Sequence, residues 1–571
     1  MASHAAPTAK ERKYDRQLRL WAASGQQALE SSRVLLINSD GPVDSDGSEL
    51  TGVVGVETLK NLVLPGIGGF TIVDPATVSE VDLGVNFFLS EDSLGKSRAE
   101  ETCKYLRELN EDVDGQAYTM TILDILEDED FLPQHQLVIV SGPIRQSILR
   151  TISQTTRRLD IPLIYTHSVG FYASFSLQLP SAFPVVETHP DASSTEDLRL
   201  TNPWPELAAA ASKAGNLDSM DDHEHGHVPY LILLLHFLEK WKANHNGLYP
   251  QNYREKSEFR DMVRSHARTN NPEGGEENFD EAVAAVLKSI GPYSLSSDLR
   301  NAFDMDECSQ LTTKSPNFWI IAAAVKEFYE THSVLPLSGS LPDMKAQSSD
   351  YIWLQNIYKS KARRDAAEVL ATVRNLECKL RAGRERVPIS EKEIDTFCKN
   401  AAHIKVIKGN EIPILSPVPS GGISQRTVKA IKSSLQNPDS LIPIFIALST
   451  LDGLVTEFKE TGHVGMTEEP SYIDKTDNWT AMLSKVLAGL GQEENGMDES
   501  ESEIRSRIES AISEVRRAGI GELHNISAMA GGCIAQEALK VLTRQYVPLD
   551  NTFILDGDEV NNETSGRLLS I

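Results

Sequence analysis

Apolar and polar positions in the first 170 residues alternate between strand-like and helix-like patterns. Residues 33–38, 70–73, 136–140 and 162–165 are short apolar runs, which are typical of buried strands. Residues 56–64 and 96–109 carry apolar side chains at helical spacing, and a Pro-Gly pair at 65–66 ends the first of these helices. Strands that alternate with helices in this way predict an α/β fold with a doubly wound, largely parallel sheet.

The pattern changes from about residue 184, where longer helical patterns follow one another. These helical patterns cover residues 230–241, 279–287, 318–328, 351–376 and 391–398. We therefore predict a large, mainly α-helical domain over residues 184–515, with an acidic and disordered stretch at 491–503. The flanking parts, 13–183 and 516–571, would together form the α/β domain, and residues 1–12 a flexible N-terminus. Periodicity alone leaves open whether the helical domain is inserted into the α/β domain.

The last 50 residues return to a helix followed by a strand. Residues 525–543 predict a helix rich in small side chains, and residues 552–555 predict a strand. Two adjacent glycines, Gly531 and Gly532, lie inside this helix, where each costs up to about 1 kcal/mol relative to alanine. Such a pair needs a tertiary reason, and we expect another backbone to approach closely at this point.

Charge and cysteine content narrow the class of protein. The 571-residue chain has a formal net charge of −27, which opposes binding to nucleic acid or to an anionic membrane. The longest apolar run is far too short to span a membrane, and the N-terminus shows no secretory signal. The five cysteines include no CxxC pair for zinc or redox chemistry. The simplest interpretation is that all five cysteines are free thiols in a reducing compartment, which would be the cytoplasm or the nucleus.

Several motifs, in a fixed order, resemble the activating enzymes of ubiquitin and its relatives. They are KYDRQLRLW at 13–21, TLKNLVLPGIG at 58–68, IVD at 72–74, LGKSRAE at 94–100 and MAGGCIAQE at 529–537. The resemblance implies a Rossmann-like adenylation fold of the ThiF type. It also implies that Asp74 corresponds to the acid on the ribose side of the nucleotide site.

Further motifs resemble one branch of that superfamily, the regulatory subunits of neddylation-activating enzymes. They are NFFL at 86–89, ETHPD at 187–191, EDLRL at 196–200, SPNFWI at 315–320, PDM at 342–344 and YIWLQN at 351–356. The resemblance implies a heterodimer with a catalytic subunit, which binds ATP and magnesium, adenylates a ubiquitin-like modifier and carries it as a thioester before cullin modification. The middle domain would resemble a catalytic-cysteine domain without its cysteine.

The chain lacks the groups that adenylation requires. A Gly-rich turn should follow the first strand, so that backbone N–H groups approach phosphates, but this turn carries Asp40, Pro42, Asp44 and Asp46 without G-x-G-x-x-G spacing. Pro42 lacks a donor and the carboxylates would repel phosphate. The arginine expected at 84–88 and the metal-binding aspartate expected at 141–143 are also missing. We therefore expect no ATP, magnesium or other metal to be bound by this chain.

The chain retains the expected residue at two positions of the nucleotide site, and neither residue alone is specific evidence for nucleotide binding. Asp74 either is a remnant of the ribose-side acid or caps a turn, and Lys96 is otherwise an ordinary surface lysine. The thiols offer no clear nucleophile, because the acids beside Cys308 would raise its pKa. Cys378, Cys398 and Cys533 lie in helical patterns that indicate buried packing.

Arg16 is the one residue for which we expect a role in catalysis, and that role is in another chain. In related dimers an N-terminal arginine reaches the neighbouring ATP site, where a guanidinium can hold phosphate oxygens. The alternative is a local ion pair with Asp15. The His-rich run at 221–227 is interpreted as a solvated helix start instead of a zinc site.

Two other functions remain open at this point. The first is a self-sufficient ATP-dependent adenylating enzyme with an atypical nucleotide site. The second is a dinucleotide oxidoreductase, which needs the same Gly-rich turn and is the weaker candidate. We predict a subunit that is inactive alone.

Overall fold

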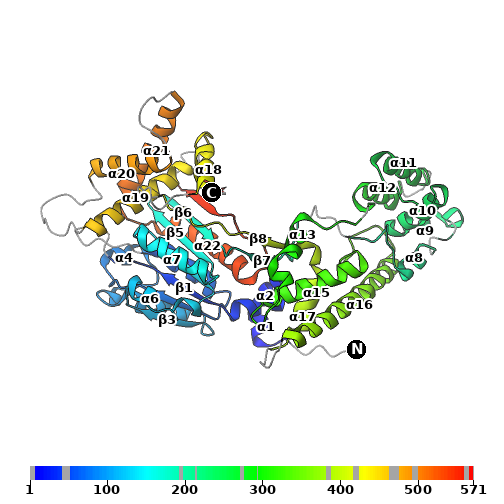
Figure 1. Cartoon of the computed structure of the whole chain (residues 1–571), viewed down its shortest axis with the longest axis horizontal. Helices are drawn as coiled ribbons and strands as arrows, with labels where there is room; N and C mark the ends of the chain where they lie inside the picture. The colour runs from blue at the N-terminus through cyan, green and yellow to red at the C-terminus, as the bar shows by residue number, and fades with distance from the viewer. Residues whose placement is uncertain are drawn as a thin grey trace. The chain divides into compact units, whose positions relative to one another are not determined.

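A computed structural model covers the chain and divides it into two compact units. Unit 1 comprises Met1–Val185 and Ile407–Ile571, and unit 2 comprises Val186–Val406 (Figure 1). The structure describes all residues except 1–6, 42–51, 192–196, 213–214, 216, 270–274, 292, 381–386, 416–423, 462–474, 492–498, 558–564 and 570–571. Among the described residues, no helix combines the length and the apolar character needed to cross a bilayer.

Unit 1 is built on an eight-stranded sheet with the order β10-β9-β6-β5-β4-β1-β2-β3. The strands are β1 (Arg33–Ile37), β2 (Gly69–Val73), β3 (Asp114–Tyr118), β4 (Leu137–Ser141), β5 (Leu163–Val169), β6 (Tyr172–Gln178), β9 (Thr552–Asp556) and β10 (Ser565–Leu569). β1 to β5 are parallel to one another, and β6, β9 and β10 continue the sheet through antiparallel pairs. The predicted α/β fold is confirmed.

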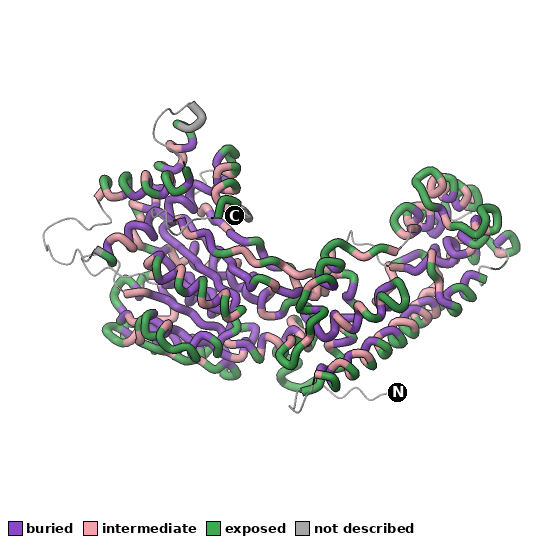
Figure 2. Tube along the Cα trace, in the orientation of Figure 1, coloured by how far each residue is buried: buried purple, intermediate pink, exposed green. Residues whose placement is uncertain are grey.

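Alternate residues of the central strands feed two hydrophobic cores, one on each face of the sheet. On β1, Val34 and Leu36 pack in the core shared with α3, α5 and α22, while Leu35 and Ile37 pack in the core shared with α6 and α7. This alternation follows from the two-residue period of a strand, and near-continuous apolar runs are typical of strands covered on both faces. Figure 2 shows the central strands buried along their length.

The helices of unit 1 surround this sheet. They are α1 (Ala9–Lys13), α2 (Asp15–Glu30), α3 (Val53–Val63), α4 (Glu80–Val85), α5 (Arg98–Glu108), α6 (Ile122–Glu127), α7 (Gln146–Arg158), α18 (Gln425–Leu435), α19 (Ile442–Thr461), α20 (Thr476–Gly489), α21 (Glu499–Ala518) and α22 (His524–Thr543), with short 3₁₀ turns η1 (Glu91–Ser93) and η2 (Leu132–Gln134). α1 begins with a capping box at Thr8, within the segment expected to be flexible.

The helices α18 to α21 belong to unit 1, although the sequence suggested a helical domain extending to residue 515. Their apolar faces share one core with Val169 and Tyr172 of the sheet and with Ile554 of β9. Helical periodicity marks these segments as helices, but it cannot say which neighbour buries their apolar faces. Of the stretch expected to be disordered, 491–503, residues 492–498 lie outside the described residues. Residues 499–503 are the first residues of α21, so the expectation is wrong for them.

Unit 2 is mainly helical, as the pattern predicted. Its elements are α8 (Pro205–Ala211), η4 (Leu217–Ser219), α9 (Asp222–Gly226), α10 (Tyr230–Asn244), α11 (Tyr253–Arg264), α12 (Glu277–Ser289), α13 (Ser297–Asp304), α14 (Asp306–Ser309), α15 (Asn317–His332), α16 (Ser348–Leu380), α17 (Glu391–Lys399) and η5 (Ala401–His403). Two hydrophobic cores hold it together, one around α10 and α12 and one around α15 and α17. The chain enters and leaves unit 2 through the paired strands β7 (Phe183–Val186) and β8 (Ile404–Ile407).

The two glycines of α22 have different environments. A Cβ on Gly531 would lie 2.9 Å from the backbone nitrogen of Thr58 on α3, so the expected close approach of another backbone is present there. A Cβ on Gly532 would meet no atom within 4 Å, and the expectation is wrong for that position. Gly531 thus lets α22 pack directly against α3.

Candidate functional site

The carboxyl ends of β1 and β2 form the place where a doubly wound sheet offers a ligand site. The strand order changes direction here, since β1 lies between β2 and β4, and α3 begins above this edge. The first N–H groups of a helix have no partner within the helix, so they attract phosphate or another anion. The groups that face the start of α3 therefore decide what this edge can bind.

A carboxylate of the chain itself occupies the start of α3. Glu522, only 5% exposed, accepts hydrogen bonds from the backbone N–H groups of Val53 (2.8 Å) and Val54 (3.1 Å). The hydroxyl of Ser527 donates to the same carboxylate at 3.2 Å. Because these donors already hold a buried negative charge, a phosphate group in their place would have to displace Glu522.

The end of β1 is neutralised within the chain as well. The Asp40 carboxylate receives two hydrogen bonds from the guanidinium of Arg145, both 2.8 Å long, and this pairing raises the pKa of Arg145. Lys459 of α19 donates to the carbonyl oxygens of Asp40 (2.8 Å) and Gly41 (3.2 Å). Cations that could hold phosphate are therefore bound to Asp40 and its backbone.

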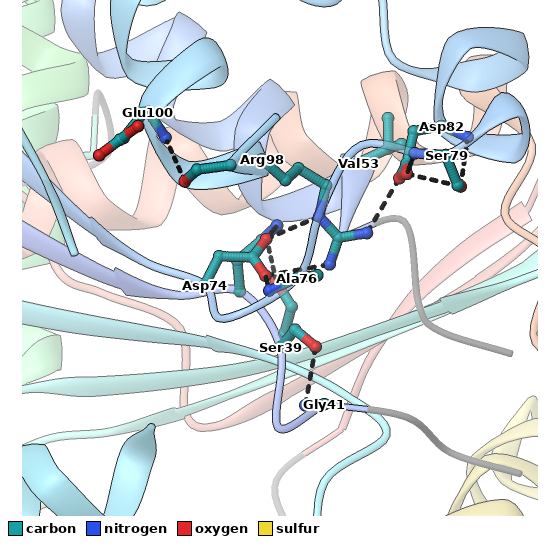
Figure 3. Close-up of polar contacts among 12 residues, drawn as sticks. Ser39, Gly41, Val53, Asp74, Ala76, Ser79, Asp82, Arg98 and Glu100 are labelled. Atoms are coloured by element: carbon teal, nitrogen blue, oxygen red, sulfur yellow. Dashed lines mark hydrogen bonds and ion pairs between the residues drawn. The ribbon is translucent and has the colours of Figure 1, made fainter. Parts of the chain in front are cut away.

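Asp74, at the end of β2, is buried in an ion-pair cluster (Figure 3). Arg98 donates to both of its carboxylate oxygens, at 2.8 and 3.1 Å, and to Asp82 at 2.9 Å. Asn38 donates to Asp74 at 2.9 Å, and the N–H of Ala76 donates at 3.0 Å. Asp74 therefore caps the turn after β2 while both of its oxygens are engaged by Arg98, which leaves it poorly placed to receive a ribose hydroxyl.

Burial and charge act in opposite directions on Arg98. Burial lowers its pKa, but the charges of Asp74 and Asp82 more than offset this, so the pKa of Arg98 lies above its ordinary value. The side chains of all three residues are at most 2% exposed. The cluster is a permanently charged structural unit beneath the site.

The residues that the sequence marked as remnants are not brought together. Lys96 is half exposed, with its ammonium group 3.9 Å from Glu101, as expected of a surface lysine. Arg16 is exposed on α2, and it forms no ion pair with any residue that the structure describes. Asp15 instead pairs with Arg19 at 3.0 Å.

The side chains on this edge do not fit magnesium–ATP. The start of α3 faces Glu522, the end of β1 faces Asp40, and the β4 end offers Ser141, whose hydroxyl donates to Asn38 at 3.5 Å. Pro42, Asp44 and Asp46 lie outside the described residues, so the turn itself is judged from its sequence alone. The described groups present carboxylates where phosphates would need donors.

The buried thiols are not activated nucleophiles. Burial raises the pKa of Cys103 and of Cys308 to about 11 and that of Cys398 to about 12. The raised pKa of Cys308 agrees with our expectation, but burial is its main cause. The acids that add to it are Glu330 and Asp304. Cys378 is exposed on α16, so its predicted burial is wrong.

The His-rich run forms the short helix α9, capped by the side chain of Asp221. His225 is buried, lies 2.7 Å from Glu276 and stacks on Phe279. Within the part of the chain that the structure describes, no three His, Cys, Asp or Glu side chains lie close enough to hold a metal ion. The run is therefore a largely exposed helix start, as expected, with His225 packed into unit 2.

A second group of titratable side chains lies in unit 1, where α19 packs on β5. The Tyr165 hydroxyl donates to Asp452 at 2.7 Å, and His167 lies 3.6 Å from the same carboxyl oxygen. Burial raises the pKa of Asp452 to about 8 and lowers that of His167 to about 3. The adjoining cavity of about 20 Å³ has room for a water molecule but not for a substrate.

Sequence analysis did not identify Glu522, Arg145 or Lys459 as parts of this edge. Glu522 lies 469 positions from Val53, and Lys459 lies 419 positions from Asp40, so no local motif links them. Arg98 belongs to a recognised motif, yet its burial between two aspartates is visible only in the fold. The acids on the turn were the usable signal, since buried acids need cations nearby.

Comparisons with known proteins give a consistent result. A sequence profile of the ThiF family matches residues 14–565. The chain is 37% identical to a NEDD8-activating enzyme E1 regulatory subunit of Xenopus laevis, over 95% of this chain and 96% of that protein. It is 35% identical to a protein of the same description from Danio rerio, over 96% and 97% of the two chains.

The comparison with solved structures gives a limited likeness. E. coli MccB, described with AMPCPP and MccA, aligns with 30% of this chain and 50% of its own at 20% identity and a TM-score of 0.26. This likeness is too limited to bear on function.

Proposed function

Because the chain belongs to the ThiF family and is a regulatory subunit of a NEDD8-activating E1 enzyme, we propose that it supports a catalytic partner without binding nucleotide itself. The Glu522 carboxylate on the first N–H groups of α3 is the observation that carries this proposal. It holds the donors that an adenylating subunit would turn towards phosphate. ATP and magnesium then bind in the catalytic subunit, as does the modifier during adenylation.

Unit 2 would serve as a wall of the modifier site instead of a thioester carrier. Its buried thiols, Cys308 and Cys398, have raised pKa values, whereas a nucleophilic cysteine needs its thiolate form near neutral pH. The proposed domain is a relative of a catalytic-cysteine domain that has kept the scaffold without the nucleophile. The product of the heterodimer is the activated modifier, which is then passed on towards cullins.

Arg16 is proposed to act in the partner's ATP site. It is exposed on α2. The alternative, a local ion pair between Arg16 and Asp15, is disfavoured because Asp15 pairs with Arg19. A guanidinium supplied from another chain could stabilise the charge that develops as pyrophosphate leaves. It would be the one side chain of this subunit with a part in the chemistry.

The reaction is proposed to take place in the cytoplasm, the nucleus or both. Free cysteines agree with a reducing compartment, and the charge of −27 disfavours nucleic acid and anionic membranes as partners. The two macromolecular partners we propose are therefore the catalytic subunit and the ubiquitin-like modifier.

Reconstitution tests the proposed division of labour. The chain alone, the catalytic subunit alone and the two together are assayed for modifier-dependent exchange between ATP and pyrophosphate. We expect exchange by the heterodimer and none by this chain alone. Exchange catalysed by this chain in the absence of a partner would overturn the proposal and support a self-sufficient adenylating enzyme.

An Arg16→Ala substitution tests the role in trans. We expect the heterodimer to form normally but to adenylate about tenfold or more slowly, since a charge-assisted contact to a reacting phosphate is lost. Arg19→Ala, on the same exposed helix, is the matched control and should keep the full rate. An unchanged rate in the Arg16→Ala dimer would remove the trans role and leave the scaffold role intact.

A further inference from the structure

A basic hollow lies on the surface of unit 2, where the first half of α16 meets the loop before it and the end of α17. Its volume is about 420 Å³, within the range of ligand-binding sites. Lys359 and Arg363 of α16 and Lys399 of α17 line it, and no acidic side chain is among the described residues that do so. In a chain with a net charge of −27, a concave surface with only positive charges is an unusual local feature.

The loop that forms one wall of the hollow is held in place by buried contacts. Gly339 has a φ of +76°, and a Cβ there would lie 2.9 Å from the Cβ of Ala362, so the loop packs directly against α16. Asp365, only 1% exposed, accepts a hydrogen bond from the N–H of Leu337 at 3.1 Å and another from the ammonium group of Lys361. The hollow is therefore built into the fold of unit 2.

The three cations of the hollow have no acidic partner among the described residues. Lys359 donates to the neutral amide oxygen of Gln355 at 2.7 Å. The side chains of Arg363 and Lys399 form no hydrogen bond or ion pair with any residue that the structure describes. All three side chains are exposed, so their charges are accessible from solvent. The hollow thus offers positive charge that carboxylates of the described chain have not taken.

An exposed stripe along α16 links the hollow to an apolar side chain. Ile352, Asn356, Lys359 and Arg363 recur at intervals of three and four residues, so they share one face of the helix. Ile352 is 56% exposed, and it lies about 16 Å from Arg363 along the helix axis. The stripe therefore has an apolar end and a basic end, separated by the length of about five residues of extended peptide.

We propose that this face of unit 2 binds an acidic peptide segment of a partner protein. Its carboxylates would lie in the hollow, where guanidinium and ammonium groups form charge-assisted hydrogen bonds with them, and an apolar side chain would pack on Ile352. The elongated shape and the apolar end favour a peptide over a small anion, which would contact the cations alone.

The negative charge of the rest of the chain does not prevent this binding. At physiological ionic strength the Debye length is about 8 Å, so distant carboxylates are screened while groups in the hollow act at contact distance. The proposal adds an interaction surface to the scaffold role and does not rest on it, because this binding requires neither nucleotide nor the catalytic subunit.

A short fluorescein-labelled peptide of glutamates and one leucine is the probe, titrated into the full chain at physiological ionic strength and followed by fluorescence anisotropy. We expect saturable binding, and no binding of the same peptide with glutamines in place of glutamates. Lys359→Gln, Arg363→Gln and Lys399→Gln should each weaken binding about threefold, because each removes one partly exposed ion pair, and the triple substitution about tenfold or more. Lys379→Gln, which changes an exposed lysine of α16 outside the hollow, should bind as the unsubstituted chain does.

Two further measurements test the apolar end and the class of ligand. Ile352→Ser should weaken binding of the leucine-bearing peptide about threefold and leave a peptide with serine in place of leucine unaffected, because only the first buries an apolar contact. Inorganic pyrophosphate, at equal concentration and matched ionic strength, should not displace the peptide. Failure of the glutamate peptide to bind, equal binding of the glutamine peptide, or equal affinity of the triple variant and Lys379→Gln would each overturn the proposal. The same loss for both peptides in Ile352→Ser, or displacement by pyrophosphate, would also overturn it, the latter by identifying a small-anion site.

Discussion

Two polar regions of unit 1 differ in how their buried charges are satisfied. At the ends of β1 and β2, each charge named above has a partner: Arg98 holds Asp74 and Asp82, and Glu522 holds the start of α3. On the side of α7 and α19, buried side-chain nitrogens of Arg150, Arg157 and His167 have no hydrogen-bond partner among the residues that the structure describes. The first region has the position of a ligand site but is closed by the chain itself, while the second contains buried polar groups that the described residues leave unsatisfied.

This difference shows why fold position alone does not identify a working site. Rossmann-like sheets bind ligands at the carboxyl ends of their strands, yet here intramolecular carboxylates have taken over the donors. A closed polar region should contribute to stability, and an unsatisfied one that contains titratable groups should make stability depend on pH. The predictions below test this contrast, from the largest expected effect to the smallest.

Removing Arg98 should have the largest effect on stability. Arg98→Ala leaves Asp74 and Asp82 buried without their cation, and we expect a loss of about 3–5 kcal/mol in the free energy of unfolding. Hydrogen exchange of the backbone amides in β1 and β2 measures this loss of stability in unit 1 separately from unit 2. Lys96→Ala, in the same motif but exposed, should change little; similar exchange in both variants would contradict the closed-cluster interpretation.

Asp452 should make the stability of unit 1 fall as the pH rises towards 8. Burial raises its pKa to about 8 from an ordinary value of 3.8, so between these values the folded chain holds a proton that the unfolded chain has released. Stability therefore decreases with rising pH, by about 1.4 kcal/mol per unit. Below pH 6.5, His167 opposes this trend, because its pKa is lowered to about 3 and the unfolded chain takes up the proton.

The window that isolates Asp452 is thus pH 6.5 to 8, and Asp452→Asn should remove the fall in stability there. Denaturant unfolding monitored at closely spaced pH values provides the measurement. Asp439→Asn changes an exposed carboxylate and should retain the wild-type pH dependence. A wild-type pH profile in Asp452→Asn would show that this carboxyl group is not the source.

The two glycines of α22 should respond in opposite directions to the same substitution. Gly531→Ala would push a Cβ against α3 and cost about 1–3 kcal/mol. Gly532→Ala meets open space and should stabilise by up to about 1 kcal/mol through helix propensity. Thermal unfolding of the two variants measures both changes in stability. Equal shifts in unfolding temperature would show that α22 does not pack closely on α3 at Gly531.

Glu522→Gln should give the smallest of these stability changes. The amide keeps one acceptor for the N–H groups of α3 but loses the negative charge that the helix N-terminus favours, at a cost of about 1 kcal/mol. Glu509→Gln, an exposed acid on α21, is the control. A gain in stability on losing the Glu522 charge would contradict its assigned role as the anion at this site.

The sequence predicts local elements better than it predicts their neighbours. Apolar periodicity located the strands β1, β2, β4, β5 and β9 and most long helices, because each signal lies within a few residues. It missed β3, whose alternating exposed and half-buried residues include few apolar side chains, and it also missed β6, β7, β8 and β10. It assigned α19 to the wrong compact unit. Which core receives a helix depends on contacts far away in the chain.

The same limit applies to the site. The acids after β1 and the absence of a Gly-rich turn were enough to predict a defective nucleotide position. The residues that close it, Glu522 and Lys459, come from segments more than 400 positions away. Their role depends on tertiary geometry that no single-sequence motif encodes.

The most direct test of the central claim is a calorimetric titration of the isolated chain with magnesium–ATP. The closed edge predicts no saturable binding at millimolar nucleotide, while the reconstituted heterodimer binds. Saturable binding by the isolated chain that is abolished by substitutions at the end of β1 would contradict the account.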